Sequence, residues 1–513
     1  MNASFLLEGL LRHNYLPLQK KDKEEVPPFL TTAAFTPTIA KKLLSVRRRN
    51  AGMGWDAVTY QATRFNGIGR PLTVPHPLPH ALLCYSIHDN WADLAYSAAS
   101  KHSLVRPRHH PDGRVIIMNY EKPQKLSHSL AFGKRFRVRT DIANFFPSIY
   151  SHAITWAAVG FAHAKANQSG NWFNELDKFV RWTKRNETQG IAIGPATSNV
   201  VAEAILVRVD DFLEQQGFEF FRYIDDYTAY CATEDQAQDF VLALSQRLAD
   251  YKLSLGLKKT SIVQLPLPDN DEWIAELTLP LPTREVDKYT AMHFLNKACV
   301  IAVDHPGGSV LKYAIKTLRS RKLKPGVVGE ILPQVMNLAF HQPTLVPLLG
   351  GLLRNTVGIG AFKYGANLHQ IAAINARFRR SDGLCWSLFF MNRHKVPIED
   401  QLATDVVATK DCLALMLLYL SGIKKHQDLV VDFAKQYIAN AADMYELDQY
   451  WILLYEMFRE GKISTPYSGE RAFEFLKKEG VSFLATAPAA QTLTQPTSPT
   501  PLAAQAAVGG ANP

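Results

Sequence analysis

The stretch FEFFRYIDDYTAYCA (residues 218–232) sets an acidic pair, Asp225 and Asp226, among aromatic and β-branched residues. Short runs of such residues on both sides of a polar centre are typical of two strands joined by a turn. A carboxylate in an apolar hairpin needs a counter-charge or a metal ion, because an isolated buried charge is costly. The stretch therefore predicts a strand–turn–strand hairpin whose turn presents two carboxylates to a cation.

Another acidic residue, Asp141, lies upstream in the stretch KRFRVRTDIANFF (134–146). Phe136, Val138 and Thr140 alternate with two arginines, which is the period of a strand with one face inward. This strand is expected to end at Asp141. Carboxylates from two strands that meet at one edge of a sheet are the minimum holder for a pair of catalytic divalent ions.

The intervening and following residues have helical patterns. SNVVAEAILVRVDDFLEQQG (198–217) has apolar spacing near 3.6 residues and ends in glycine, and DQAQDFVLALSQRLADYKL (235–253) is amphipathic. The order strand, helices, hairpin, helix favours an α+β domain with helices on one face of an antiparallel sheet.

The flanking regions differ from this central part in composition. Residues 1–130 alternate basic clusters with proline-rich turns, which predicts irregular structure with short elements, including a strand at RVIIMNY (114–120). Residues 285–480 are mostly helical in pattern, with helices expected in the segments 406–422, 427–445 and 448–461. Residues 485–513 lack charge and large apolar groups and are predicted to be disordered.

These patterns predict four parts. They are an N-terminal extension (1–130), a central α+β domain (131–284), an α-helical domain that could be repeat-like (285–484) and a disordered tail (485–513).

Charge and composition narrow the class of protein. The 513 residues are 47% hydrophobic and carry a formal net charge of +10, which favours a polyanionic partner such as nucleic acid. The five cysteines are widely spaced and include no CxxC pair, so neither a disulfide framework nor a zinc site is expected. No apolar run reaches membrane-spanning length and the N-terminal stretch lacks a basic start, so we expect a cytoplasmic protein without membrane contact.

Four motifs in one order resemble those of reverse transcriptases. They are DIANFF (141–146), GIAIGPATSNVVAE (190–203), YIDD (223–226) and GLKKT (256–260). The resemblance implies a right-hand polymerase with fingers and palm, followed here by an all-helical C-terminal domain. It also implies two Mg²⁺ ions (or Mn²⁺), deoxynucleoside triphosphates (dNTPs) as substrates, and single-stranded DNA, with RNA as a further candidate partner.

The resemblance assigns roles to residues by their place in these motifs. It implies metal ligation by Asp141, Ile142, Asp225 and Asp226, and catalysis by the three aspartates together with Lys259, which would protonate or neutralise the leaving pyrophosphate. It implies nucleotide contacts by the residues Ile142, Phe146, Gly194, Pro195, Ser198, Tyr223 and Arg114. Phe146 occupies the place of an aromatic gate that excludes a 2′-hydroxyl.

Departures from the common pattern narrow the resemblance further. Ile193 stands where glutamine is usual, no leucine–glycine primer grip follows Lys259, and no RNase H, HNH endonuclease or retron signature is found. What remains is similar to bacterial defence-associated reverse transcriptases of the abortive-infection (Abi) type. That family implies antiphage defence, homo-oligomers, and DNA synthesis that can proceed without a template and from a protein tyrosine.

Other interpretations stay open from the sequence alone. One is a conventional RNA-templated reverse transcriptase; another is a nucleic-acid-binding scaffold with a relic palm; a third, an RNA polymerase, is disfavoured by Phe146. Basic residues outside the palm are ambiguous as well. Arg70, Arg106 and Arg108 lie in the expected fingers, and RFRRSDG (377–383), with Phe378, is a candidate contact for single-stranded product.

Overall fold

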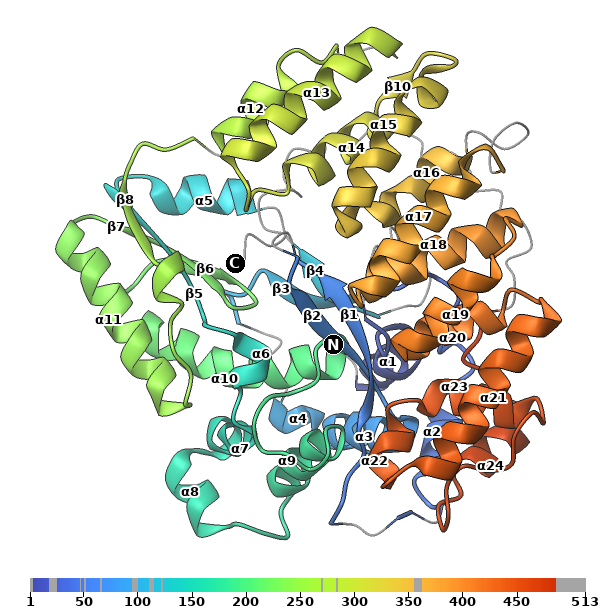
Figure 1. The fold of residues 1–513 in the computed structure, drawn as a ribbon. Coiled ribbons are helices and arrows are strands. Elements are labelled where there is room, and N and C mark those ends of the chain that lie inside the picture. Colours follow the sequence, from blue (N-terminus) through green and yellow to red (C-terminus); the bar gives the residue numbers. More distant parts are fainter. Residues whose placement is uncertain are drawn as a thin grey trace.

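A four-stranded antiparallel sheet with the strand order β6-β7-β5-β8 organises the central part of the chain (Figure 1). Its strands are β5 (Phe136–Asp141), β6 (Phe220–Tyr223), β7 (Asp226–Cys231) and β8 (Ser261–Gln264). β6 and β7 form the predicted hairpin, and β5 ends at Asp141 as expected. The register pairs Asp141 with Asp226 across the two central strands.

This computed structural model describes most of the chain. The described residues are 3–17, 25–46, 48–49, 52–64, 67–94, 100–109, 115–120, 123–268, 271–282, 285–354 and 362–485. The tail predicted to be disordered lies outside them from residue 486 onward.

Two long helices support the sheet. α10 (Ala196–Gln215) and α11 (Glu234–Asp250) confirm the predicted helices, each shifted at its ends. α11 begins at Thr233, whose side chain accepts a hydrogen bond from the Gln236 amide, and it packs its apolar stripe against β5, β7 and β8. The α+β expectation is therefore confirmed.

The N-terminal part contains two hairpins and one helix longer than predicted. β1 (Ala57–Thr63) pairs with β2 (Gly69–Pro75), and β3 (Val105–His109) pairs with β4 (Val115–Tyr120), the strand expected at 114–120. The prediction that proline prevents long helices here is wrong for α3 (Pro77–Asp89). Its prolines occupy the first turn, where the missing amide is not needed. The remaining helices up to α10 are short: α1 (Ala3–Glu8), a π-helix (Gly9–His13), α2 (Pro37–Leu43), α4 (Trp91–Leu94), α5 (Pro123–Ala131), α6 (Phe145–Ser148), α7 (Ser151–Val159), α8 (Phe161–Ala166) and α9 (Trp172–Trp182).

The C-terminal half is helical, as predicted, apart from a two-residue parallel pair between β9 (Glu285–Val286) and β10 (Lys322–Leu323). Its α-helices are α12 (Glu272–Thr278), α13 (Lys288–Asp304), α14 (Val310–Ser320), α15 (Val327–His341), α16 (Leu349–Arg354), α17 (Gly365–Arg377), α18 (Ser381–His394), α19 (Asp400–Thr409), α20 (Cys412–Tyr419), α21 (Lys424–Asn440), α22 (Met444–Asp448), α23 (Trp451–Arg459) and α24 (Ala472–Lys478), with 3₁₀ turns η3 (Leu257–Lys259), η4 (Pro343–Leu348) and η5 (Phe362–Tyr364).

Two of the predicted helical segments are broken. Segment 406–422 is divided between α19 and α20 at Lys410, whose φ of 57° ends α19, and Asp411 then caps α20. Segment 427–445 is divided between α21 and α22, with Asp443 capping α22. In both places a capping aspartate competes with continuation of the helix.

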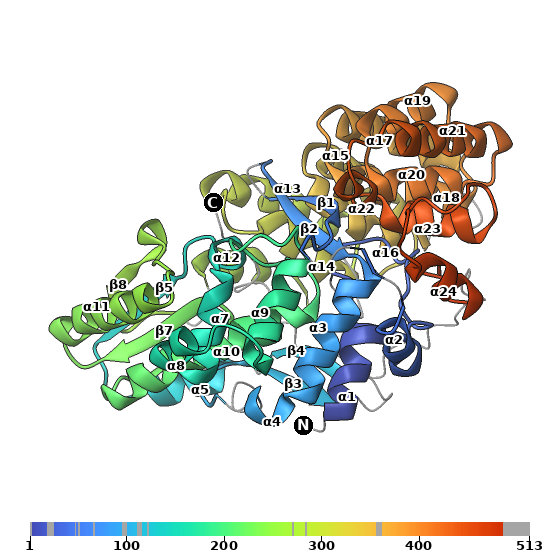
Figure 2. The same ribbon diagram turned by 90° about the horizontal axis from the view of Figure 1, so that it is seen from below.

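The N-terminal and C-terminal parts share one hydrophobic core. β1 packs against α18, α20 and α23, and α2 lies beside α24 (Figures 1 and 2). Leu30 pairs with Leu484 in a β-bridge, flanked by hydrogen bonds from the Thr31 amide to the Phe483 carbonyl and from the Ala485 amide to the Phe29 carbonyl, both 2.8 Å. The β1–β2 hairpin therefore lies between the central sheet and the helical half.

A buried ion-pair cluster fastens this junction. The Arg49 guanidinium donates to both carboxylate oxygens of Asp448 at 2.8 Å and to Glu470 at 2.9 Å. Trp55 donates to Glu470 at 3.0 Å, and Trp451 donates to the Val74 carbonyl at 2.9 Å.

Within the described ranges, no helix is both long and apolar enough to cross a membrane, and all five cysteines are free.

Candidate active site

Three carboxylates meet where β5 ends and the β6–β7 hairpin turns. Asp141 is the last residue of β5, Asp225 lies in the turn, and Asp226 begins β7. The Ile142 amide donates to the Asp225 carbonyl at 3.2 Å, so the backbone after Asp141 is tied directly to the turn. Ile224 in the turn has a φ of 55°, a left-handed conformation that is costly for a β-branched residue. Such strain persists only where the surroundings enforce it.

The Asp141 side chain is buried and held on one side only. Its Oδ2 accepts from the Lys259 Nζ at 2.7 Å, whereas its buried Oδ1 accepts no hydrogen bond from a described residue. Gly256 lies against this second oxygen so closely that a Cβ there would collide with it. The structure thus keeps one oxygen of the Asp141 carboxylate, beside Gly256, without a hydrogen-bond partner among the described residues.

The electrostatic cost of gathering the acids appears in their pKa values. Desolvation, followed by the charge of Asp141, raises the pKa of Asp225 from 3.8 to about 6. Asp226 remains open to solvent by area, yet desolvation by the protein around it and the charges of Asp225 and Asp141 raise its pKa to about 7. Lys259 acts in the opposite direction on both groups. The positive charge of Lys259 is therefore too small to offset the desolvation and mutual repulsion of Asp225 and Asp226.

The donor set fits hard divalent cations. Carboxylate oxygens are the ligands that Mg²⁺ and Mn²⁺ prefer, and the unpartnered Oδ1 of Asp141 is one of them. Across the described ranges, no three acidic, histidine or cysteine side chains are already gathered around a single point as a metal cluster. Lys259, bound to Asp141, contributes the nearest neutralising charge.

Lys259 is positioned by the turn η3 (Leu257–Lys259). This turn follows Gly256, whose amide donates to the Asp141 carbonyl at 2.8 Å. The hydroxyls of Thr140 and Thr260 lie 2.7 Å apart and fasten the turn to β5. The two motifs 141–146 and 256–260 are thereby brought together, as the sequence predicted.

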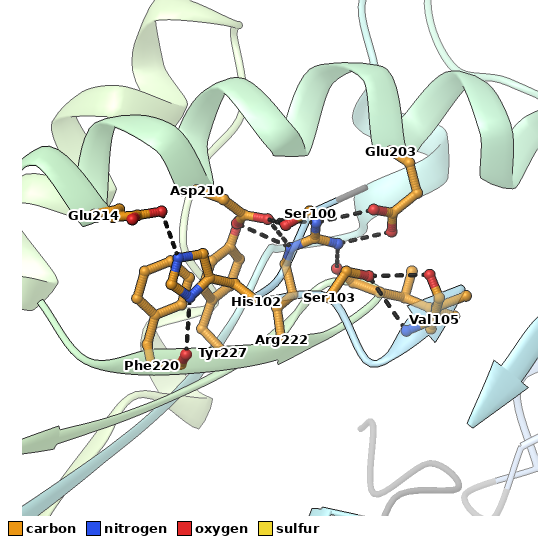
Figure 3. A network of polar contacts seen from close by, with 11 residues as sticks. Ser100, His102, Ser103, Val105, Glu203, Asp210, Glu214, Phe220, Arg222 and Tyr227 are labelled. Atoms are coloured by element: carbon orange, nitrogen blue, oxygen red, sulfur yellow. Dashed lines mark hydrogen bonds and ion pairs between the residues drawn. The ribbon is translucent and has the colours of Figure 1, made fainter. Parts of the chain in front are cut away.

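A buried arginine, Arg222, joins the β6–β7 hairpin to α10 through ion pairs with Glu203 and Asp210 (Figure 3). Arg222, fully buried in β6, forms bidentate ion pairs with Glu203 at 2.8 and 3.0 Å and contacts Asp210 at 2.7 Å, both from α10. The same guanidinium donates to the Ile224 carbonyl at 2.9 Å. The strained residue of the turn is therefore tied through Arg222 to the helix that follows the glycine-rich motif.

The network also reaches the segment before β3. The Arg222 amide donates to the His102 carbonyl at 2.7 Å, the Leu104 amide donates to the Arg222 carbonyl at 2.8 Å, and Ser100 donates to Asp210 at 2.8 Å. Sequence analysis did not single out Arg222 or Asp210. The signal was available, because a lone arginine inside the apolar run FEFFRY must either face solvent or find a buried acid.

One arginine of the N-terminal hairpin faces this site. Arg70 on β2 lies close enough to Asp225 to lower its pKa, against the effect of burial. Arg106 and Arg108 lie in β3 at backbone level, and their side chains are outside the described parts, as is the whole of Arg114.

The glycine-rich motif packs against the N-terminal segment. Gly194 has a φ of 133°, and a Cβ there would lie 2.7 Å from Pro17, so only glycine fits. The Thr73 amide of β2 donates to the Ile193 carbonyl at 2.8 Å. Pro195 precedes α10, and Ser198 is buried in its first turn. These residues join the hairpin to α10.

Phe146 and Tyr223 are close in sequence to the carboxylates, five residues after Asp141 and two residues before Asp225. Phe146 is partly buried in α6, with its ring 5.2 Å from that of Phe145, and its carbonyl accepts from the Ile191 amide at 3.0 Å. Tyr223 is paired with Asp226 across the hairpin, and burial together with the charges of Asp226 and Asp225 raises its pKa. Their nucleotide contacts remain predictions.

Comparison with known proteins supports the resemblance in its coarse form. The model of the reverse transcriptase (RNA-dependent DNA polymerase) family matches residues 119–295, which contain Asp141, Asp225 and Asp226. None of the curated proteins compared with the chain matches it.

Solved structures with partial similarity include two telomerases. One is the telomerase of Candida albicans in complex with a fragment of telomeric RNA. It is 9% identical in sequence, the match covers 77% of this chain and 67% of that chain, and the TM-score is 0.30. The other is the apo telomerase of Candida tropicalis, with 11% identity, 78% and 73% coverage, and a TM-score of 0.30. The family match, the four-stranded sheet and the order of the motifs agree: residues 119–295 form a reverse transcriptase domain, and the protein is a nucleotidyltransferase of the RNA-directed DNA polymerase class.

Proposed function

We propose that Asp141, Asp225 and Asp226, with the main chain of Ile142, hold two Mg²⁺ or Mn²⁺ ions for DNA synthesis from dNTPs. The observation that carries this proposal is the convergence of three carboxylates at one sheet edge, with one buried oxygen left unsatisfied. When bound, such ions activate the 3′ oxygen and neutralise the triphosphate. No structural role accounts for acids whose charges repel one another.

The surrounding cations take supporting roles. Arg70 approaches the catalytic turn from the β1–β2 hairpin, where it meets the phosphates of an incoming dNTP. Lys259 neutralises Asp141 in the free protein and is placed to transfer a proton or a hydrogen bond to the leaving pyrophosphate. Phe146 serves as the gate against a 2′-hydroxyl.

We further propose the division of the chain into fingers (1–130), palm (131–284) and helical domain (285–484). The basis is the position of the carboxylates on the central sheet and of Arg70 on a separate hairpin. The helical domain takes the place of a thumb, and its shared core with the N-terminal part makes it integral to the polymerase.

The finer proposal is an antiphage effector of the abortive-infection type, a cytoplasmic bacterial homo-oligomer whose synthesis can be untemplated and primed from a tyrosine. It is supported by the motif GIAIGPATSNVVAE with Ile193 in place of glutamine. A conventional RNA-templated enzyme and a scaffold with a relic palm are the alternatives that an assay must separate.

The test is synthesis by the purified protein in Mg²⁺ with labelled dNTPs, in parallel reactions with primed RNA, with primed DNA and with no nucleic acid. Asp225→Asn serves as the matched inactive control because it removes one charge at constant shape. Product that stays with the protein after denaturation, in the reaction without nucleic acid, supports the finer proposal.

The alternatives have distinct outcomes. Product only on primed RNA identifies a conventional reverse transcriptase. Nucleic-acid binding with no incorporation under any condition identifies a scaffold. Equal activity of Asp225→Asn and the wild type would remove these carboxylates from the mechanism.

A further inference from the structure

A small polar cavity lies where the β1–β2 hairpin meets the helical domain. Its volume is about 40 Å³, which is room for a few water molecules and too little for a nucleobase. The residues that line it are Thr63, Arg64, Gly67, His341, Gln342, Pro343, Thr344 and Arg380. They come from three places in the chain, namely the end of the hairpin, the α15–η4 junction and the residue before α18. No acidic residue is among them.

The two arginines of this cavity have no counter-charge in the described part of the chain. No carboxylate there forms an ion pair with Arg64 or with Arg380. Burial and the nearby charge of Arg70 both lower the pKa of Arg64. Asp382 accepts hydrogen bonds from the amide and hydroxyl of Thr63, which lines the cavity, but it forms no ion pair with either arginine. Guanidinium groups remain charged in proteins, so two of them without ion-pair partners favour an anion.

The hairpin is shaped to bring Arg380 close. Gly67 has a φ of 77°, and a Cβ at this position would lie 3.3 Å from a guanidinium nitrogen of Arg380. The turn at this glycine is closed by hydrogen bonds from the Gly67 amide to the Arg64 carbonyl and from the Arg64 amide to the Ile68 carbonyl, both 2.9 Å. Arg64 and Arg380 therefore share the cavity although more than 300 residues of chain separate them.

An exposed aromatic ring stands beside these arginines. Phe378 is 53% exposed, and the guanidinium carbons of Arg380 and Arg377 lie 4.9 and 5.6 Å from its centroid. A ring stacked by arginines is the platform on which proteins place a base of a single strand.

The cavity is connected to the catalytic turn by a line of positive charge. Arg70, which acts on Asp225, is paired with Ala62 across the hairpin, two residues from Arg64. Its charge acts on Arg64 as well. A nucleic-acid backbone that runs from the carboxylates along the hairpin would meet Arg70, Arg64 and Arg380 in that order.

We propose that this cavity binds a phosphodiester group of a single nucleic-acid strand, with the phosphate between Arg64 and Arg380 and the adjoining base on Phe378. The site rests on the proposed polymerase function for its position in the reaction. It takes a strand and not a free nucleotide, because its anion site and its aromatic ring are separate and the cavity excludes a base.

The test is binding of a fluorescent oligothymidylate, about 20 nucleotides long, measured by anisotropy as a function of salt in EDTA without dNTPs. Arg64→Gln and Arg380→Gln should each lower the slope of log affinity against log salt by about 0.7, the value for one lost phosphate contact on a single strand. Arg380→Lys should keep most of the slope. Lys435→Gln, an equal loss of charge on α21, is the control and should keep the wild-type slope.

Phe378→Ala separates the base from the phosphate. It should weaken binding of oligothymidylate by about 5- to 150-fold at unchanged slope, and it should have no effect on an abasic strand of equal length. A parallel series with oligouridylate shows whether the strand is DNA, RNA or either. Thermal unfolding of each variant excludes loss of fold as the cause.

The proposal is overturned if Arg64→Gln and Arg380→Gln give the slope of the Lys435→Gln control, or if inorganic phosphate and pyrophosphate compete as well as the strand does. Because no metal or substrate is present, these results do not depend on catalysis. Absence of DNA synthesis with altered slopes would refute the polymerase function alone; synthesis with unaltered slopes would refute this site alone.

Discussion

At the scale of single residues, the two acids at the β6–β7 turn, Asp225 and Asp226, raise the free energy of the folded protein when they are ionised. The pKa values of Asp225 and Asp226 rise from 3.8 to about 6 and about 7. In the unfolded chain both acids ionise near their ordinary value. Below about pH 4 the folded and unfolded states are both protonated and no stability is lost. As the pH rises from about 4 to between 6 and 7, the unfolded chain releases these protons while the folded protein keeps them, so the free energy of unfolding falls; it levels off once the folded protein has ionised.

Asp225→Asn should therefore raise the melting temperature of the metal-free protein at about pH 8, and the gain should disappear near pH 4. Mg²⁺ should stabilise the wild type more than the variant, because the ion loses one ligand. Thermal unfolding across pH, in EDTA and in Mg²⁺, measures both effects. A gain of equal size at both pH values would mean that charge repulsion is not its origin.

We propose that the choice between ribose and deoxyribose depends on another single residue, Phe146. Phe146 lies in α6, five residues after Asp141, beside the glycine-rich motif. Phe146→Ala should increase ribonucleotide relative to deoxynucleotide incorporation, because it opens space for a 2′-hydroxyl. Single-nucleotide incorporation with matched pairs of substrates measures the ratio. Phe145→Leu tests the buried neighbour, and an unchanged ratio in Phe146→Ala would place the gate elsewhere.

Sequence predicted the three aspartates and Lys259 because each lies in a short motif whose chemistry is local. It did not predict Arg222 or the need for glycine at position 256. Both depend on contacts between residues that are distant in sequence. Arg222 forms ion pairs with Asp210 and Glu203, which lie 12 and 19 residues earlier in the chain, and Gly256 lies against the side chain of Asp141. Residue type alone cannot show such packing.

At the scale of elements, the β6–β7 turn depends on α10. Arg222 lies between Glu203 and Asp210 of α10 (Figure 3). It also donates to the carbonyl of the left-handed Ile224, so the turn that carries Asp225 is held by a helix as well as by its own backbone. The sheet and both helices follow from hydrophobic period and were predictable. The breaks at Lys410 and between α21 and α22 were not predictable. The residues at both breaks have helix propensity, and the helices end there because the next helix begins with its own capping residue.

Arg222→Lys should keep the charge yet lose the geometry, because an ammonium group cannot bind two carboxylates and the Ile224 carbonyl in the same way. We expect a higher Mg²⁺ concentration for half-maximal activity and a lower kcat, with the KM for dNTP little changed. Arg247→Lys on α11 is the control, because the only carboxylate among the described residues with which Arg247 forms an ion pair is Asp250, although its side chain also contacts Tyr251 and Phe212.

Arg222→Met should destabilise the fold by about 3–5 kcal/mol, because it leaves buried acids unpaired. If Arg222→Lys is less stable but has wild-type Mg²⁺ dependence, Arg222 supports the fold without positioning the turn.

At the scale of the whole molecule, residues from both ends of the chain form a single core. Arg49 lies at its centre, bound to Asp448 and Glu470. The predicted division at residue 285 follows composition, which reports helical content but not which segments pack together. The hairpin β1–β2 was placed with the fingers by its position in the chain, and it also packs on α18, α20 and α23.

Arg49→Met should lower the free energy of unfolding by about 3–5 kcal/mol, because two buried carboxylates lose their counter-charge. Arg48→Met, at an exposed neighbour, should change it by less than about 0.5 kcal/mol. Denaturant unfolding followed by tryptophan fluorescence reports on the junction through Trp55 and Trp451. Separate transitions for the N-terminal and helical parts in the wild type would contradict a shared core.

The bridge between Leu30 and Leu484 has a consequence for how the protein is made. A ribosome releases the chain from its N-terminus, so Phe29, Leu30 and Arg49 leave the exit tunnel long before their partners have been translated. The central sheet can form in the meantime, since its strands all lie between residues 136 and 264. The first segment must wait, and a nascent chain that stops before residue 381 leaves Arg49 without Asp448 and Glu470 and leaves β1 without α18, α20 and α23 to cover it. Translation of the last helices is thus the event that completes the first strands.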